Sequence, residues 1–426
     1  LPSTLAGSRS PLFMVSDAPP KYIIVGGGTA GCVLANRLTE NKDNSVLVLE
    51  AGSSKFGARD ITMPIGILRL FKSVFDWGFE SENEKIVTGD GIYLCRGKVL
   101  GGSSCTNVML YHRGVEADYD GWGVEGWGAK DVLPYFTKAE NNRSKGKGEY
   151  HGKGGLMEVE NVRYMNPLTK MFFKACEQAG LPKNDDFNDW GHSQEGFGRF
   201  QQVAQKKGKR CSAASSYLKK AIKRENLSVE TSAQLIKVLI EDGKAVGVEY
   251  VQEGEKRVAK VAPGGEVLLA GGAISSPQML MLSGVGPAEH LESKNIEVKS
   301  DLPGVGKNLK DHPAVTVMAD INKPLSITDR VLRPGSGKVN KLVGLQWMLT
   351  GTGPLTSPGC DNGAFHKTSP DKAKPDLQLR FVPGRSDTPD GVKAYNKIGA
   401  QGRPPSGVTL QVPACLSNHA SLMWYT

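Results

Sequence analysis

The sequence predicts an α/β fold of two interwound domains, one built around a parallel sheet and the other around a mixed or antiparallel sheet. The chain has 426 residues, which is too long for one compact core, so two closely joined domains are expected. Near its start, a strand-like run, a glycine-rich turn, a helical stretch and a second strand-like run follow one another in the pattern of a βαβ unit. Later stretches mix Trp, Gly and Pro with weaker periodicity, which indicates a second domain of another kind.

The predicted βαβ unit begins with the β-rich run Tyr22–Val25 and continues as a helix to Leu38. Its second strand is Ser45–Glu50, a run of apolar residues that ends on a carboxylate. The unit is about thirty residues long, as expected for two parallel strands joined by a helix.

Between the first strand and the helix lie Gly26, Gly28 and Gly31, spaced as Gly-x-Gly-x-x-Gly. The first glycine allows a tight turn, the second lets the backbone approach a pyrophosphate, and the third lets the helix pack against the strand. The N-terminus of the helix also offers unpaired N–H groups to the phosphates. Glu50 would accept hydrogen bonds from a ribose and would repel a 2′-phosphate. The sequence thus predicts a Rossmann-type dinucleotide-binding domain, disfavours NADP, and leaves NAD and FAD open.

Three further elements are predicted for this domain. The stretch Leu227–Tyr250 alternates apolar and polar residues and contains the hairpin signal Glu241–Gly243. Glu266–Ala270 reads as a buried strand, and a helix is expected over Ser275–Leu282. We therefore assign 21–115 and 225–313 to the dinucleotide-binding domain, and 116–224 and 314–426 to a substrate domain that wraps around it.

Composition and charge exclude several other classes of protein. The net charge is +9, but Lys and Arg are spread along the chain, with only short groups at Lys206–Arg210 and Lys219–Arg224. These groups are expected to be solvated faces, so no nucleic-acid partner is predicted. The seven cysteines are odd in number and form no Cys-x-x-Cys, which argues against a disulfide framework or a metal site and favours a reducing compartment. No run of eighteen apolar residues predicts a transmembrane helix.

Two longer stretches resemble the signatures of the glucose–methanol–choline (GMC) oxidoreductases. Gly97–Gly114 is similar to the first signature and Gly272–Gly286 to the second, while Gly304–His312 resembles the turn that follows in that family. The resemblance runs from Lys21 to about Gln411 and departs from the usual pattern at Thr106, where an aliphatic residue is typical. It implies that the dinucleotide is FAD.

The resemblance also implies which residues surround the flavin. Residues at the matching family positions contact the phosphates, the ribose, the adenine or the isoalloxazine ring. In this sequence they are Gly26, Gly28, Thr29, Ala30, Gly31, Glu50, Ala51, Val99, Ser103, Asn107, Val108, Met109, Leu110 and Leu235. The loop Gly101–Ser104 is rich in backbone donors, which suits a phosphate or the flavin edge. For Leu235 and Val99, simple core packing is an equally good interpretation.

The later part of the chain resembles one branch of the family, the algal fatty acid photodecarboxylases. The similarity lies in Gly359–Phe365 and Pro375–Gly384, which contain Cys360 and Arg380. It implies light-driven conversion of a fatty acid to an alkane or alkene and CO₂, with Cys360 and Arg380 as the catalytic pair. An arginine can fix a carboxylate through two hydrogen bonds and stays charged. Tyr395 and Gln411 match substrate-binding positions in that branch. Core packing for Cys360 and a surface ion pair for Arg380 are the structural alternatives.

Two other functions stay open, namely a choline-like alcohol dehydrogenase or oxidase and a non-catalytic flavin-binding fragment. The resemblance implies a C-terminal histidine base in the alcohol-oxidising members, and the chain ends before that region. The pair Asn418–His419 lacks the usual surroundings. We therefore expect the C-terminal part of the family fold to be missing. Residues 1–20, rich in Ser and poor in acids, fit either a disordered terminus or the remnant of a transit peptide. A chloroplast location is predicted, with another organelle or the cytoplasm as alternatives. Contact with a membrane surface is left open.

Overall fold

A computed structural model describes residues 18–82, 91–205, 208–333, 338–385 and 406–414. The chain divides into two compact units, each assembled from two segments. The first unit is Leu1–Ser54 with Tyr217–Asn308, and the second is Lys55–Ser216 with Leu309–Thr426. Residues 55–115, which we assigned to the FAD-binding domain, make most of their contacts within the second unit. The assignment of ligands to the two domains stays a prediction.

The first unit is built on a parallel sheet of four strands in the order β10–β2–β1–β14. These strands are β10 (Leu227–Thr231), β2 (Val46–Glu50), β1 (Tyr22–Val25) and β14 (Glu266–Leu269). Tyr22 of β1 is in register with Val46 of β2 on one side and Glu266 of β14 on the other. The helix α1 (Thr29–Leu38) joins β1 to β2, which confirms the predicted βαβ unit. Its strands are nearly free of solvent, as expected for a parallel sheet covered on both faces.

An antiparallel sheet β11–β12–β13 packs within the same unit. The hairpin of β11 (Ala233–Glu241) and β12 (Lys244–Gln252) turns at Asp242 and Gly243, both with positive φ, as a two-residue hairpin turn requires. The hairpin prediction is confirmed, but Leu227–Tyr250 is not one continuous antiparallel element. Ser232, with φ +55°, separates β10 of the parallel sheet from β11.

The remaining elements of the first unit are short, apart from one helix. They are α6 (Lys219–Ala221), β13 (Glu255–Lys260), α7 (Gly272–Leu282), β15 (Val285–Gly286), α8 (Ala288–Ser293) and β16 (Ser300–Asp301). The helix predicted over Ser275–Leu282 is confirmed as α7, which begins three residues earlier. Its Met279 packs against the core shared by the two sheets.

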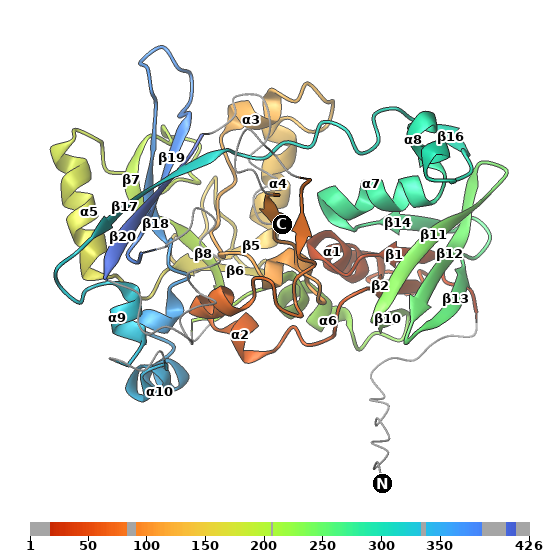
Figure 1. Cartoon of the computed structure of the whole chain (residues 1–426), viewed down its shortest axis with the longest axis horizontal. Coiled ribbons are helices and arrows are strands. Elements are labelled where there is room, and N and C mark those ends of the chain that lie inside the picture. The colour runs from red at the N-terminus through yellow and green to blue at the C-terminus, as the bar shows by residue number, and fades with distance from the viewer. Residues whose placement is uncertain (1–17, 83–90, 206–207, 334–337, 386–405, 415–426) are drawn as a thin grey trace, which may run out of the picture. The chain divides into compact units, whose positions relative to one another are not determined.

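The second unit is organised around a five-stranded sheet in the order β17–β20–β19–β18–β7 (Figure 1), in which all neighbours are antiparallel. The strands are β17 (Ala314–Asp320), β20 (Gly407–Pro413), β19 (Leu377–Val382), β18 (Asn362–His366) and β7 (Gly196–Arg199). One face of this sheet is covered by α5 (Pro167–Gln178), whose Cys176 packs on Phe197 and Ala364. This matches the antiparallel sheet predicted for the substrate domain.

Smaller elements complete the second unit, except that Tyr217 and Leu218 at the end of one of them belong to the first unit. They are α2 (Arg59–Thr62), η1 (Pro64–Arg69), β3 (Phe79–Glu80), β4 (Tyr93–Leu94), η2 (Gly102–Cys105), α3 (Glu116–Asp120), α4 (Ala129–Ala139), β5 (Glu140–Asn142), β6 (Met157–Asn161), β8 (Gln201–Gln205), β9 (Lys209–Arg210), η3 (Ala214–Leu218), α9 (Ile327–Val331), α10 (Lys341–Thr350) and η4 (Pro354–Thr356). Strands β5, β6, β8 and β9 form a second sheet of four strands.

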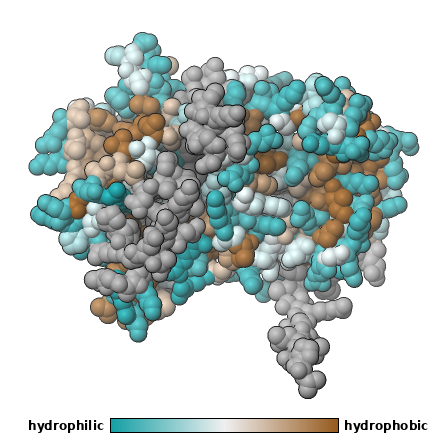
Figure 2. Space-filling model, viewed as in Figure 1, coloured by the Kyte–Doolittle hydropathy of each residue, from teal (hydrophilic) through white to brown (hydrophobic). Residues whose placement is uncertain are grey.

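The helix α10 presents an unusual outer face. Trp347 on its inner side is buried in a core cluster, whereas Leu342 and Leu349 are 75% and 69% exposed. Hydrophobic residues are visible at the molecular surface in this region (Figure 2). Among the described residues, no helix has the length and apolar character needed to cross a bilayer.

Candidate functional site

The glycine-rich turn of the first unit has the geometry that its motif predicts. Gly26 has φ +104°, and a Cβ there would lie 2.6 Å from the carbonyl oxygen of Ala270, so only glycine fits. A Cβ on Gly31 would lie 1.9 Å from the carbonyl oxygen of Gly26, which explains how α1 comes so close to the turn. Gly28 precedes the helix with φ −73°. The two outer glycines are therefore needed for the fold itself, whereas Gly28 has a backbone conformation open to other residues.

The N-terminus of α1 suits an anionic ligand. No side chain caps it, and its first turn contains no acidic residue. Thr29 at the first helical position has a buried hydroxyl without a hydrogen-bond partner in the described structure. Ala30 is exposed, which leaves the turn accessible. Unpaired N–H groups, a partial positive charge and an orphaned hydroxyl fit the pyrophosphate of a dinucleotide.

Glu50 at the end of β2 is buried and fixes the glycine-rich turn. One carboxylate oxygen accepts the N–H of Gly27 at 2.8 Å and the other accepts that of Gly52 at 2.7 Å. Ala51 lies between these contacts and is half-buried. A carboxylate oxygen can accept more than one hydrogen bond, so a contact with a ribose hydroxyl is compatible with these two bonds. The ribose contact of Glu50 stays a prediction.

Leu235 lies in β11 and belongs to the hydrophobic core of the first unit, where it is 8% exposed. It packs in the same cluster as Val248 and Tyr250. This is the core packing that we considered equally good, and a contact with adenine stays a prediction.

The second unit contains the loop of the first family signature. Gly101 and Gly102 have positive φ and lead into the single turn η2. The Ser103 hydroxyl accepts the N–H of Gly97 at 3.2 Å. Val99 is fully buried in a core cluster, as its alternative interpretation predicts. The loop is therefore held in part by the Ser103 side chain and is tightly packed at Val99.

The loop continues through a strained stretch. Asn107 accepts the N–H of Met109 through its side-chain oxygen at 3.0 Å, and Met109 has φ +62°, which is rare for a residue with a side chain. Val108 is half-buried, and Leu110 packs beside Phe187, Phe200 and Phe365. Strained backbone often occurs at ligand sites, where the surrounding structure holds it in place.

The predicted head-group residues meet on the five-stranded sheet. Arg380 of β19 is directly opposite Gly363 of β18 and Gln411 of β20. Residues opposite each other in neighbouring strands project from the same face, so the side chains of Arg380 and Gln411 share a face. The alternate residues Ala364 and Leu379 project from the other face, against α5. The structure thus separates an apolar face under the helix from a face that carries Arg380.

Arg380 is only 6% exposed, and its Nε donates to the Gln378 side-chain oxygen at 3.0 Å. Cys360 lies just before β18 and is 7% exposed. Burial raises the pKa of the Cys360 thiol to about 12, although the positive charge of Arg380 partly opposes this. Cys360 is therefore a neutral thiol at physiological pH, close enough to Arg380 to feel its charge. Tyr395, the fourth predicted residue of this group, lies outside the described residues.

Two polar residues beside this group were not predicted. His112 stands among the rings of Phe187, Phe200 and Phe365, and both its ring nitrogens are buried without a hydrogen-bond partner in the described structure. Burial, and next the charge of Arg380, lower the pKa of His112 to about 3, so the imidazole is neutral. Burial also raises the pKa of Asp361 to about 6. His112 lies inside the first signature, but no local sequence pattern indicates that the charge of Arg380 acts on it.

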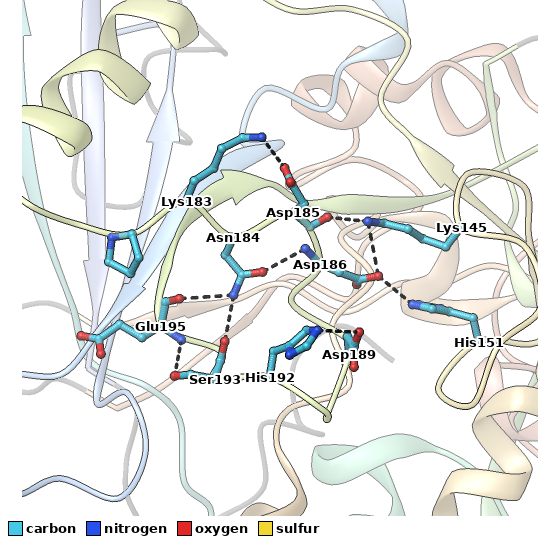
Figure 3. A pocket seen from close by; sticks show the side chains of 11 residues that line it. Lys145, His151, Lys183, Asn184, Asp185, Asp186, Asp189, His192, Ser193 and Glu195 are labelled. Carbon is cyan, nitrogen blue, oxygen red and sulfur yellow. Dashed lines mark hydrogen bonds and ion pairs between the residues drawn. The ribbon is translucent and has the colours of Figure 1, made fainter.

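A polar pocket of about 720 Å³ also lies in the second unit, lined by Lys145, His151, residues 182–186, Asp189, His192, Ser193 and Glu195 (Figure 3). Its charged groups pair with one another. Lys145 and His151 both contact Asp186, at 3.5 and 2.8 Å, and His151 also contacts the buried Glu140 at 3.1 Å. Burial lowers the pKa of His151, but the hydrogen bonds to Asp186 and Glu140 outweigh it and raise the pKa to about 9. The pocket therefore contains an internal ion network.

One expectation about charge is wrong. The basic group Lys206–Arg210 was predicted to form a solvated face, but Arg210 is 3% exposed. Its guanidinium donates to the carbonyl oxygen of Ile61 and to the side-chain oxygen of Asn107 in the signature loop. The sequence around Arg210 does not indicate that its side chain is buried, because the residues it contacts are more than 100 positions away in the chain.

Comparison with known proteins places these features in a family. Residues 20–314 match the family model described as GMC oxidoreductase. The chain is 50% identical over 410 residues to the chloroplastic fatty acid photodecarboxylase of Chlamydomonas reinhardtii, covering 92% of this chain and 66% of that protein. It is 42% identical over 369 residues to an alcohol dehydrogenase [acceptor] of Pseudomonas putida, covering 85% of this chain and 65% of that protein.

Solved structures agree on the fold. A pyridoxine 4-oxidase from Mesorbium loti superposes with a TM-score of 0.76 at 26% identity, covering 92% of this chain and 70% of that one. A formate oxidase from Aspergillus oryzae gives a TM-score of 0.81 at 23% identity, covering 94% and 73%. At that identity the second similarity concerns the fold alone. The chain spans about two thirds of the length of the curated relatives described above.

Proposed function

Because this chain belongs to the GMC oxidoreductase family, whose members use FAD, we propose that it is a flavoenzyme that decarboxylates fatty acids in light. The proposed products are an alkane or alkene and CO₂. Support comes first from the relatives, since the identity to the photodecarboxylase is 50% over 92% of the chain, against 42% over 85% for the alcohol dehydrogenase.

The observation that carries the proposal is the group formed by Arg380, Gln411 and Cys360. A guanidinium buried on the polar face of a sheet is a strong site for a carboxylate, because it stays charged and offers donors in a fixed plane. Gln411, in register with Arg380, adds an amide to the same face. The fatty acid tail would require an apolar environment, and Phe200 and Phe365 lie near this group.

FAD would supply the redox chemistry by accepting one electron from the carboxylate when excited by light. The chain's own residues bind and orient the head group. Arg380 is assigned to hold the carboxylate, and it also stabilises the ionised form of the acid. Cys360 is assigned to the catalytic pair as a neutral thiol, since its raised pKa of about 12 excludes the thiolate at physiological pH. A thiol can donate a hydrogen atom to the alkyl radical left after CO₂ departs, and return of the transferred electron together with a proton would restore the thiol.

The alternative is oxidation of an alcohol, which the similarity to alcohol dehydrogenase and to choline dehydrogenases supports. That reaction needs a base near the flavin. His112 is poorly suited to this role, because its pKa of about 3 makes the neutral imidazole a weak base. The sequence pair Asn418–His419 lies outside the described residues.

The two functions are separated by one experiment on the purified, FAD-loaded protein. Palmitate is supplied under blue light and in darkness, and CO₂ and hydrocarbon are measured. Choline and a simple alcohol are supplied in darkness with an electron acceptor. The proposal requires hydrocarbon from palmitate only in light. Oxidation of choline in darkness without any hydrocarbon in light would establish the alternative.

The same relative is chloroplastic, and this supports a proposal for where the chain acts. We propose a chloroplast location, where light and fatty acids are both present. A fluorescent fusion of the gene product, imaged in its own cell type, tests this.

A further inference from the structure

Two buried polar groups of the second unit have no hydrogen-bond partner in the part of the chain that the structure describes. Gln202 of β8 is fully buried, and neither its amide oxygen nor its amide nitrogen is bonded. His112 is the second, and both of its ring nitrogens are buried and unbonded. Buried polar groups are nearly always hydrogen-bonded, because leaving them unpaired is unfavourable. Four unpaired atoms on two side chains therefore require an explanation.

The side chains of His112 and Gln202 project from the same face of a short strand pairing. Leu110 lies opposite Gln202 in an antiparallel bridge. Continuing this register by two residues places His112 opposite Phe200, and the centroids of these two rings are 4.5 Å apart. Because side chains alternate between the two faces of a strand, His112 and Gln202 are diagonal neighbours on one face. Diagonal neighbours are within reach of long side chains.

The ring of His112 lies over the face of the five-stranded sheet that carries Arg380. Gly363, directly opposite Arg380, is covered by Phe200, since a Cβ on Gly363 would lie 2.5 Å from the Phe200 ring. Phe365, two residues further along β18, projects from the same face as Gly363. The ring centroids of Phe365 and His112 are 5.5 Å apart. His112 therefore borders the site proposed for the carboxylate.

Both side chains can donate hydrogen bonds. Burial, and next the charge of Arg380, lower the pKa of His112 to about 3, so the ring is neutral and has one N–H group in either tautomer. The amide of Gln202 has two N–H donors. An ionised carboxylate only accepts hydrogen bonds and has about four acceptor positions, of which a two-point contact with an arginine uses two. Unpaired donors beside a fixed positive charge therefore suit such an anion.

We propose that His112 and Gln202 are substrate-binding residues that donate hydrogen bonds to the carboxylate of a fatty acid held at Arg380. The inference rests on the proposed function, which supplies the carboxylate, and it adds two residues to the recognition of the head group. It explains why unpaired polar side chains occur beside Phe200 and Phe365, where an apolar side chain would be the more stable choice. Arg380 supplies the charge, and the two neutral donors fix the orientation of the head group.

Two variants of the full, FAD-loaded chain test the proposal, and a third is the matched control. His112→Phe keeps an aromatic ring and Gln202→Met keeps the side-chain length, while each removes the hydrogen-bonding atoms. The control is Gln201→Met, because Gln201 is adjacent and also buried but projects from the opposite face. Its side-chain oxygen accepts from Asn142 at 3.4 Å and from Asn188 at 3.3 Å.

The dissociation constant for palmitate is measured in darkness beside that for hexadecane, which has the tail but no head group. Thermal unfolding is recorded without either ligand. We expect His112→Phe and Gln202→Met each to bind palmitate about tenfold or more weakly and to bind hexadecane as the parent does. Without ligand, both should unfold at the temperature of the parent or above it, because an apolar group replaces an unpaired polar one. The control should show the reverse, with a lower unfolding temperature and unchanged affinity for palmitate.

The inference is overturned, and the proposed function is left standing, if the parent and both variants bind palmitate equally well. An equal loss of palmitate and hexadecane also overturns it, since His112 and Gln202 would then only shape the apolar surroundings of the tail. So does a clearly lower unfolding temperature in both variants, which would assign these side chains to the fold. A parent protein that binds no palmitate would contradict the proposed function together with this inference.

Discussion

Arg380 is the buried side chain on which the proposed chemistry of the site depends most. Its Nε donates to the side-chain oxygen of Gln378, and its planar guanidinium is the kind of group that a carboxylate binds through two hydrogen bonds. The planar fork, as well as the charge, would matter for such binding, and lysine cannot reproduce it.

Arg380→Lys should therefore weaken fatty acid binding about ten- to a hundredfold, the range for losing a hydrogen bond to a charged group. FAD binding should be unchanged. The measurement is titration of palmitate into FAD-loaded protein in darkness, compared with Cys360→Ser, which we expect to bind palmitate normally and turn over slowly. Equal palmitate affinity in the parent and Arg380→Lys would remove Arg380 from the head-group site.

His151 makes a contribution to the free energy of unfolding that depends on pH. Its pKa is raised to about 9, above the ordinary value of 6.5, by Asp186 and Glu140. A group with a raised pKa stabilises the fold fully below its unfolded pKa, and this contribution is lost as pH rises through the folded pKa. The same contacts, against the opposing effect of burial, lower the pKa of Glu140 and of Asp186, so their contribution is lost at acidic pH.

We expect the free energy of unfolding to fall between pH 7 and pH 10 by on the order of 3 kcal/mol from this residue. Urea unfolding of the parent and of His151→Gln at both pH values gives the comparison. The variant should be less stable at pH 7 and should lose much less than the parent on going to pH 10. Parallel losses in the two proteins would assign the pH dependence to other groups.

At the scale of elements, the glycines of the βαβ turn are required for different reasons. Gly31 is a packing position, since a Cβ would lie 1.9 Å from the carbonyl oxygen of Gly26. Gly28 has φ −73°, which any residue adopts, and the motif predicts that its lack of a side chain allows a ligand to approach.

Gly28→Val should therefore keep the fold and lose FAD, whereas Gly31→Val should destabilise the fold itself. Far-UV circular dichroism with thermal unfolding reports on the fold, and flavin absorbance after gel filtration reports on FAD content. A Gly28→Val protein that elutes with a full complement of FAD would contradict the assignment of the turn to the pyrophosphate.

The local elements were largely predictable, because each depends on its own residues. The βαβ unit follows from the spacing of Gly26, Gly28 and Gly31, and the β11–β12 turn from Asp242 and Gly243. Local prediction fails at Ser232. The alternating pattern continues across this residue, but the strand before it, β10, belongs to the parallel sheet and the strand after it, β11, to the antiparallel sheet. Periodicity shows that a segment is extended, but it does not identify the strand with which that segment pairs.

The candidate site was predictable in part, for the same reason. Cys360, Arg380 and Gln411 were found through a family resemblance, and the register of β19 and β20 then shows Arg380 beside Gln411. His112 and Arg210 were missed, because their roles depend on contacts with segments far away in the sequence. No local pattern distinguishes a buried arginine such as Arg210 from a solvated one before the fold is known.

At the scale of the whole molecule, FAD should stabilise the protein by mass action. A ligand that binds only the folded state adds about 2.7 kcal/mol to the free energy of unfolding at a hundred times its dissociation constant. We expect excess FAD to raise the unfolding temperature of the parent, and removal of FAD to lower it. Scanning calorimetry with and without added FAD measures this. Gly28→Val is the matched control, and a rise of the same size in that variant would show that the effect is not due to the turn.

The order of strands in the first unit also determines how long its central strands remain without their neighbours during translation. During translation β1 and β2 leave the ribosome first, but their outer neighbours β10 and β14 are encoded about 180 and about 240 residues later. At the usual rates of synthesis this delay is roughly 10–50 s. Throughout it, Ile23, Ile24 and Val25, which are buried in the finished sheet, belong to a two-stranded nascent pair with both edges open. We therefore expect such a nascent chain to bind chaperones before the sheet is complete and can bind a dinucleotide.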